Sequence, residues 1–324
     1  MPQESVNYAV GRISMLRRDA MDMSRLERLL AASSYEEAKR TLSEIGWTGV
    51  ETADYEQLAL SRVADASEIV RSLTTDERVT DCFLLKYDIA NLKMLLKARC
   101  LGAPAEYLSE SGTIPVDSLR HAVNDHSYGF LPEKIAAAMD ELEKELVIDV
   151  NPMAIDVKLD RAMYALIQEK LAGTRCKSAK AYFRARADVL NGVALLRARQ
   201  MRRDADFFAE TLLPGGTISE TAWRGAYETP ETLPTLLQPY GRAVEDAARA
   251  AVLDFGRLPA LEKALDNELL RLFTPYKYEM TIENVIGYLL SVEREAAAVR
   301  LVMAGKQAGF PEEAVRERLR DLYG

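Results

Sequence analysis

Hydrophobic and polar positions alternate along this chain with the period of an α-helix. Apolar residues recur every three or four positions, a spacing that gathers them on one helical face. The pattern predicts principal helices at residues 8–32, 54–73, 76–101, 132–147, 179–203, 241–255 and 281–304. The stretches between them are short and rich in Gly, Pro, Ser and Thr, which suit turns and caps. The sequence therefore predicts an all-α protein built from compact helical modules.

A repeated motif is the most informative feature of the sequence. It consists of an acidic residue, an amide three positions later and an arginine eleven positions later. Two copies lie 100 residues apart: Asp88, Asn91 and Arg99; Asp188, Asn191 and Arg199. Each copy is followed by a Gly-Thr-Ile turn, at 112–114 and 216–218.

A third, weaker copy lies near the C-terminus. Glu295, Arg300 and Lys306 stand 207 positions after Asp88, Lys93 and Arg99. The spacing predicts three helical modules, at residues 1–105, 106–205 and 206–324. A partial echo also appears near the N-terminus, where a helix runs into residues 29–34 and a second short helix.

Helical geometry indicates what the motif does. Positions 88, 91, 92, 95, 96 and 99 share one face, so polar groups lie beside core leucines. A carboxylate placed there needs partners, which Asn91 or an arginine of a neighbouring helix could supply. We interpret the motif as structural, because a catalytic acid–base site is normally built once and this one is built two or three times.

Composition narrows the function classes. The net charge is −8 and the pI is about 5.2, which disfavours general nucleic-acid binding because that depends on clustered cations. The chain begins without an apolar signal segment, so we expect a cytoplasmic protein. The longest apolar run, at 285–292, is too short to cross a bilayer, so no direct membrane insertion is expected.

Candidate chemistry is sparse. Cys82, Cys100 and Cys176 form no Cys-x-x-Cys pair, and the only histidines, His121 and His126, are poorly spaced for a metal. The sequence contains neither a phosphate-binding Gly-x-x-x-x-Gly-Lys loop nor a Gly-x-Ser-x-Gly nucleophile motif. We therefore predict no catalytic residue, no metal site and no cofactor.

Two segments together resemble a known family. The first runs from Tyr87 to Ala98 and is followed by the turn at 112–114; the second covers 283–295 and continues through Arg300 to residues 305–309. In order and spacing they resemble the C subunit of the V/A-type rotary ATPases, which is similar to the d subunit of the eukaryotic V-ATPases. The N-terminal residues 8–13 and 29–47 fit the same pattern, so the resemblance covers nearly the whole chain.

The resemblance implies a funnel of three similar helical modules around a pseudo-threefold axis. It implies a non-catalytic central-stalk protein that couples the rotor shaft, formed by the D and F subunits, to the membrane proteolipid ring. Ion transport, such as proton transport, would thereby be linked to ATP synthesis or hydrolysis. The protein would be peripheral, held at the cytoplasmic face of the membrane by its complex. This sequence departs from the pattern at Ala298, where the first two copies have asparagine.

The main alternative is an all-helical, solenoid-like adaptor that binds proteins along a groove. Solenoids usually repeat every 30 to 50 residues, whereas these modules recur at about 100, which favours a closed ring. A helical enzyme is the third possibility, and it would show one concave pocket with convergent polar side chains.

Overall fold

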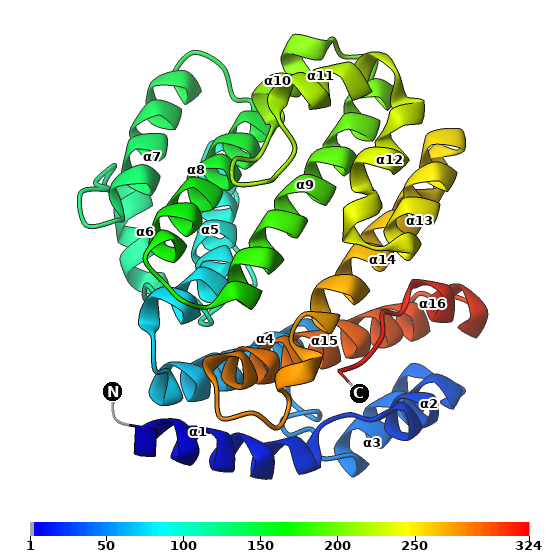
Figure 1. Cartoon of the computed structure of the whole chain (residues 1–324). Helices are drawn as coiled ribbons and strands as arrows, with labels where there is room; N and C mark the ends of the chain where they lie inside the picture. Colours follow the sequence, from blue (N-terminus) through cyan, green and yellow to red (C-terminus); the bar gives the residue numbers. More distant parts are fainter. Residues whose placement is uncertain (1–2, 324) are drawn as a thin grey trace. The chain divides into compact units, whose positions relative to one another are not determined.

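The structure is a computed structural model that describes the backbone of residues 3–323 and the side chains of residues 6–323 except residue 19. Every regular element in this range is a helix, so the predicted all-α class is confirmed for the described chain (Figure 1). Within the same range, no helix combines the length and apolar character needed to cross a membrane.

The chain divides into two compact units. Unit 1 combines the N-terminal segment up to Thr80 with Ser109–Ser111 and the C-terminal segment from Phe273. Unit 2 comprises Asp81–Leu108 and Gly112–Leu272. The two ends of the chain therefore belong to the same unit.

Unit 1 is organised around its longest helix, α15 (Ile282–Gln307). The long helix α4 (Tyr55–Leu73) runs alongside it (Figure 1), and shorter helices from the N-terminal segment also pack on it. These are α1 (Gln3–Leu16), α2 (Met23–Ala31) and α3 (Tyr35–Glu44). From the C-terminal segment, α16 (Glu312–Arg318) and the single turn η5 (Thr274–Tyr276) pack on it as well, and the single turn η1 (Arg17–Asp19) contacts α1. Because α15 is covered on several sides, it is apolar around most of its circumference.

Unit 2 contains the long helices α8 (Pro152–Ala172) and α9 (Lys177–Gln200) and all but the first turn of the long helix α5 (Glu77–Leu101). Helix α8 packs against both α7 (Glu133–Leu146) and α9, and α9 packs against α14 (Leu258–Arg271). The remaining helices are α6 (Val116–Asn124), α7 (Glu133–Leu146), α10 (Ala205–Thr211), α11 (Glu220–Glu228), α12 (Leu233–Leu237), α13 (Arg242–Leu253) and α14 (Leu258–Arg271). Single 3-10 turns, η2 (Pro230–Thr232), η3 (Gln238–Tyr240) and η4 (Phe255–Arg257), join the shorter helices.

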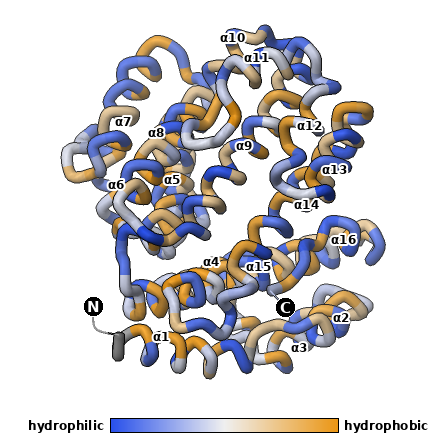
Figure 2. The backbone as a smooth tube through the Cα atoms, viewed as in Figure 1, coloured by the Kyte–Doolittle hydropathy of each residue, from blue (hydrophilic) through white to orange (hydrophobic). Residues whose placement is uncertain are grey.

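Local sequence explains where helices begin. Asp54 caps α4, because its carboxylate accepts a hydrogen bond from the backbone N–H of Gln57. The side-chain oxygen of Gln57 in turn accepts a hydrogen bond from the backbone N–H of Asp54. Asn151 caps α8, and Pro152 occupies its first position, where its missing N–H costs nothing. Along the tube in Figure 2, hydrophobic and hydrophilic segments alternate within each helix, as one-sided burial requires.

The predicted helix at 8–32 is wrong as a single element. The backbone is extended at Ala20, and a new helix, α2, begins after Asp22, whose side chain accepts a hydrogen bond from Arg25 N–H. Helices α8 and α14 were not among the predicted elements. Two sequence signals could have identified them: the Asn-Pro pair at the start of α8, and Pro259 in the first turn of α14.

Candidate functional site

The acidic residues of the repeated motif are buried on three long helices. Asp88 lies on α5, Asp188 on α9 and Glu295 on α15, and their exposed fractions are 1%, 0% and 3%. A buried carboxylate without partners would cost several kcal/mol. The groups around each carboxylate therefore reveal what the motif does.

Asp88 holds the loop that leads into α6. Its carboxylate accepts hydrogen bonds from the backbone N–H of Thr113 at 2.9 Å, from the Thr113 hydroxyl at 2.7 Å and from the N–H of Ile114 at 3.1 Å. Gly112 completes the close approach, because a Cβ atom there would lie 2.0 Å from Asp88 Oδ1. The Gly-Thr-Ile turn is thus shaped around the carboxylate.

Asp188 makes the same contacts in front of α11. It accepts from Thr217 N–H at 2.6 Å, from the Thr217 hydroxyl at 2.8 Å and from Ile218 N–H at 3.4 Å. The Tyr240 hydroxyl donates to the same carboxylate. A Cβ atom at Gly216 would lie 1.9 Å from Asp188 Oδ1, so glycine is required here as well.

Glu295 makes the corresponding contact with the N-terminal segment of the chain. It accepts from Met21 N–H at 3.4 Å and from the Arg62 guanidinium at 3.3 Å. Burial raises the pKa of Glu295 above its usual value, while the positive charge of Arg62 acts in the opposite direction. Ala20 occupies the position that threonine has in the other two copies, so this residue offers no hydroxyl to the carboxylate. The side chain of Glu295 is longer than that of aspartate and accepts the Met21 N–H.

The three carboxylates share one relationship. Each accepts the N–H of the residue immediately before the N-cap of a short helix: Ile114 before Pro115 of α6, Ile218 before Ser219 of α11, and Met21 before Asp22 of α2. A negative charge is favoured there because helix N-termini carry partial positive charge.

The basic residues of the motif act at the other end of the same short helices. Each donates to the backbone carbonyl of the next-to-last helical residue: Arg99 to Val123 at 2.5 Å, Arg199 to Tyr227, and Lys306 to Leu30 at 2.6 Å. Carbonyls in the last turn lack helical partners, and cations are favoured beside them. One long helix therefore holds a short helix at both ends.

The spacing is the same in all three copies. On the long helix the basic residue lies eleven positions after the acidic residue. At the short helix the residue with the carbonyl acceptor lies nine positions after the residue with the N–H donor. In the third copy the short helix is α2, which precedes α15 by more than 250 residues in sequence. The N-terminal echo in the sequence is the signal that could have identified it.

Arg99 also connects α5 to α7. Its guanidinium donates to both oxygens of Glu143, at 2.7 and 2.9 Å, and His126 and Tyr128 contact the same carboxylate. Burial acts to raise the pKa of Glu143, but the hydrogen bonds from Tyr128, Arg99 and His126 outweigh it and the pKa is lowered. Burial and the neighbouring Glu143 raise the pKa of Tyr128.

The amide and the remaining cation have separate roles. Asn191 exchanges two hydrogen bonds with the backbone of Leu213, at 3.1 and 2.7 Å. Asn91 is buried at the equivalent position of α5, and Ala298 can form no such side-chain bond. Arg300 pairs with Glu56 of α4 at 2.7 Å.

The motif residues are thus distributed over both units and are not gathered into one site. In the copies at Asp88 and Asp188 the donors described above are loop N–H groups and hydroxyls, which the sequence pattern did not indicate as partners. Only at Glu295 is one of them an arginine of a neighbouring helix. Among the residues whose side chains are described, no group of three or more His, Cys, Asp or Glu could hold a metal ion.

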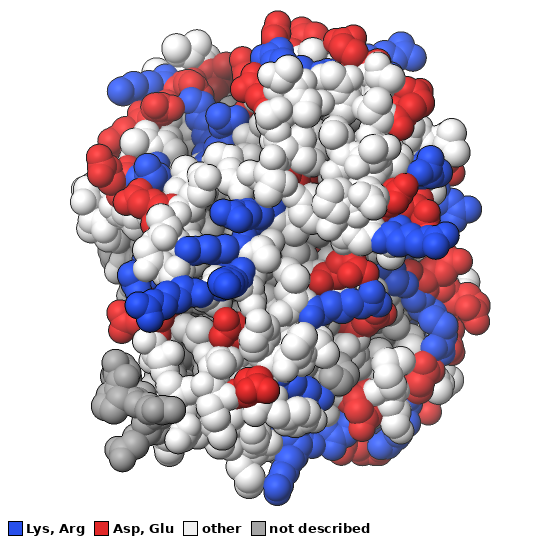
Figure 3. Space-filling view, in the orientation of Figure 1, with Lys and Arg blue, Asp and Glu red and all other residues white. Residues whose placement is uncertain are grey.

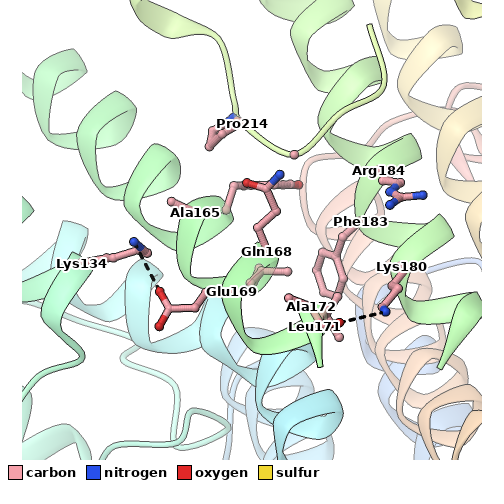
Figure 4. A pocket seen from close by; sticks show the side chains of 13 residues that line it. Lys134, Ala165, Gln168, Glu169, Leu171, Ala172, Lys180, Phe183, Arg184 and Pro214 are labelled. Carbon is pink, nitrogen blue, oxygen red and sulfur yellow. Dashed lines mark hydrogen bonds and ion pairs between the residues drawn. The ribbon is translucent and has the colours of Figure 1, made fainter. Parts of the chain in front are cut away.

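A separate cavity opens between α8 and α9 in unit 2. Its volume is about 660 Å³ and its wall includes Tyr164, Gln168, Phe183 and Arg184 (Figure 4). Figure 3 shows Lys and Arg side chains close together over this part of unit 2.

Comparison with known proteins shows one consistent relationship. Residues 9–318 match the profile of a family described as ATP synthase (C/AC39) subunit. The chain is 23% identical over 343 residues to the C subunit of the V-type ATP synthase of Deinococcus radiodurans, covering 98% of this chain and 92% of that protein. It is 24% identical over 262 residues to the C subunit of the A-type ATP synthase of Haloferax volcanii, covering 73% and 72%. It is also 24% identical over 287 residues to the corresponding A-type protein of Thermococcus onnurineus, covering 83% and 76%.

Proposed function

The chain belongs to the ATP synthase (C/AC39) subunit family, as a C subunit of the V/A-type rotary ATPases, and on this basis we propose that it is their non-catalytic central-stalk coupler. In this role it joins the rotor shaft, formed by the D and F subunits, to the membrane proteolipid ring. Ion transport, such as proton transport, is thereby linked to ATP synthesis or hydrolysis. The observation that carries the proposal is the family match over residues 9–318.

The contacts of the repeated motif support a mechanical role. A part that transmits torque must resist deformation, and each long helix is tied to a short helix by contacts at both of its ends. A buried hydrogen bond to a charged group contributes about 1.5–3 kcal/mol, and leaving such a group unpaired costs more. The bonds at Asp88, Arg99 and their counterparts therefore oppose sliding between helices under load.

We further propose that the three modules surround a pseudo-threefold axis to form a funnel. The predicted divisions at residues 105 and 205 stay predictions. The contacts of α15 with α2 bring the N-terminal helices and α15 together within unit 1. The protein would need no cofactor and would be held at the cytoplasmic face of the membrane by its complex.

The proposal is tested by recovering the complex. A tagged full-length chain is expressed in its own cells, membranes are solubilised in mild detergent, and bound proteins are identified by mass spectrometry. We expect the D and F subunits and the proteolipid to be recovered. A tagged, unrelated helical protein in the same cells is the control. Recovery of other soluble proteins without ATPase subunits would instead support the adaptor.

Coupling itself requires a second measurement. Membrane vesicles that lack the chain should lose ATP-driven ion uptake, and adding back the purified chain should restore it. Uptake that is unchanged without the chain would contradict the proposed role.

A further inference from the structure

We propose that the cavity between α8 and α9 binds a small aromatic carboxylate. This inference goes beyond the coupling function proposed above and does not depend on it. The described lining residues of the cavity all belong to unit 2, and none of the repeated charges of the motif is among them.

The size of the cavity suits a small molecule. Its volume of about 660 Å³ falls within the range of about 300–1,000 Å³ typical of ligand pockets. A second cavity of about 260 Å³ adjoins it, because Tyr164, Ile167 and Phe183 line both. The wall of this second cavity is largely apolar, so the space that continues from the first can accept the apolar part of a ligand.

Aromatic side chains form the wall that the two cavities share. The half-buried ring of Phe183 packs against Phe83 and Tyr182, with ring centroids 4.9 and 5.0 Å apart, so its orientation is fixed. Tyr164 contributes a buried ring from α8. Figure 4 shows Phe183 beside Gln168, with the loop at Pro214 across one side. Aromatic rings pack well against one another in offset or edge-on contacts, so this wall favours a flat aromatic group.

The charge of the lining is opposite to that of the whole protein. Three cations, Lys134, Lys180 and Arg184, line the first cavity, whereas Glu169 is the one acidic residue of its described lining. Glu169 pairs with Lys134 at 3.3 Å, so these two charges offset each other. A net positive cavity therefore lies on a chain whose net charge is −8.

The other two cations have no acidic partner among the described side chains. Lys180 donates to the carbonyls of Ala172 and Thr174, at 3.4 and 2.8 Å, and no described carboxylate pairs with it. Arg184 is exposed and likewise forms no ion pair with a described residue. The two residues are four positions apart on α9, so they share a face. Their charges are available to an anionic group beside the aromatic wall.

The available donors favour a carboxylate over a phosphate. Phosphate sites commonly use the backbone N–H groups of a glycine-rich loop. Here the N–H groups of Thr217 and Ile218, which follow the loop at the cavity, already donate to Asp188. The side chains that remain are the guanidinium of Arg184 and the ammonium of Lys180. A guanidinium matches the two oxygens of a carboxylate and also stacks on aromatic rings.

The test uses the purified full-length chain and para-benzoylbenzoate, an aromatic carboxylate whose benzophenone group crosslinks on irradiation. We expect saturable labelling of the α8 or α9 residues that line the cavity, located by mass spectrometry. Acetate, which lacks the ring, should not compete, and labelling should weaken with added salt. Labelling that does not saturate, or that lies elsewhere on the chain, would overturn the inference.

Charge variants test the role of Arg184 in the same assay. Arg184→Glu reverses one cavity charge, and we expect it to raise the Kd about tenfold or more because it places like charges together. The matched control is Arg242→Glu, which makes the same change at the exposed start of α13 and should stay within about threefold of the wild type. If Arg184→Glu binds as tightly as Arg242→Glu, the cavity is not the carboxylate site.

Competition on the wild type identifies the anionic group without relying on the folding of a variant. Para-methylbenzoate should displace the label, whereas adenosine monophosphate, which offers a ring and a phosphate, should displace it only at concentrations about tenfold higher or more. If adenosine monophosphate competes at the lower concentration, the cavity is a nucleotide site and the inference is overturned. These measurements need no other subunit, so their failure would leave the coupler proposal standing.

Discussion

Lys306, near the C-terminus, donates a hydrogen bond of 2.6 Å to the backbone carbonyl of Leu30, 276 residues earlier in the chain. The bond joins the last turn of α15 to the last turn of α2, and Glu295 on the same long helix holds the start of α2 through Met21. The two ends of the sequence thus complete between them the arrangement that α5 and α9 each make with a short helix that follows in sequence.

Removing the Lys306 ammonium should loosen α2 locally. In Lys306→Met the carbonyl of Leu30 loses its cation, and we expect a loss of about 1 kcal/mol in the free energy of unfolding. Faster amide hydrogen exchange should be confined to α2. Lys39→Met on the adjacent helix α3 is the control and should leave exchange in α2 unchanged. Equal protection of α2 in wild type and Lys306→Met would contradict the assigned role.

Glycine at 216 should be far less replaceable than glycine at 225. In Gly216→Ala the new Cβ would lie 1.9 Å from Asp188 Oδ1, so the loop or the carboxylate must move and hydrogen bonds are lost. We expect a loss of about 2–4 kcal/mol. Gly225→Ala lies within α11 with nothing within 4 Å, and should be neutral or stabilising by up to about 1 kcal/mol. Urea unfolding of both variants provides the comparison, and similar stabilities would refute it.

The Glu143 network should stabilise the fold only while its carboxylate is ionised. The pKa of Glu143 is lowered in the folded protein from a usual value of 4.5. Its contribution is therefore fully present above about pH 4.5 and is lost as pH falls through the lowered pKa. The difference in unfolding free energy between wild type and Glu143→Gln should shrink as the pH is lowered below about 4.5 in urea titrations. A difference that grows on acidification would exclude this assignment.

Glu295 should show the opposite pH dependence. Burial raises its pKa above the usual 4.5, so in the window above 4.5 the folded state retains a proton that the unfolded state releases. The free energy of unfolding contributed by this group therefore falls as pH rises through that window. Relative to Glu295→Gln, the wild type should lose stability from pH 4.5 towards neutrality. Parallel pH profiles for the two proteins would show that the burial of Glu295 has no such effect.

Much of the architecture could be predicted from the sequence because it is local. Apolar spacing located helices such as α4 and α5, and the fixed offset between Asp88 and Asp188 exposed the repeat. The Gly-Thr-Ile turns could be recognised because only glycine allows the backbone to approach a carboxylate closely. The break at Ala20 was missed because the apolar period continues across it, whereas the backbone is extended at Ala20 and Asp22 caps the start of a new helix.

By itself, the sequence determined the helical class, the repeat and the family resemblance, since these depend on residue type and spacing along the chain. The partners of the repeated charges were decided only by the tertiary structure. Asp88 and Glu295 are the same kind of residue in sequence, yet one holds a loop 25 residues ahead and the other holds Met21, 274 residues behind. A hydrogen bond acts over about 3 Å of space and is indifferent to chain separation, so only folding brings such partners together.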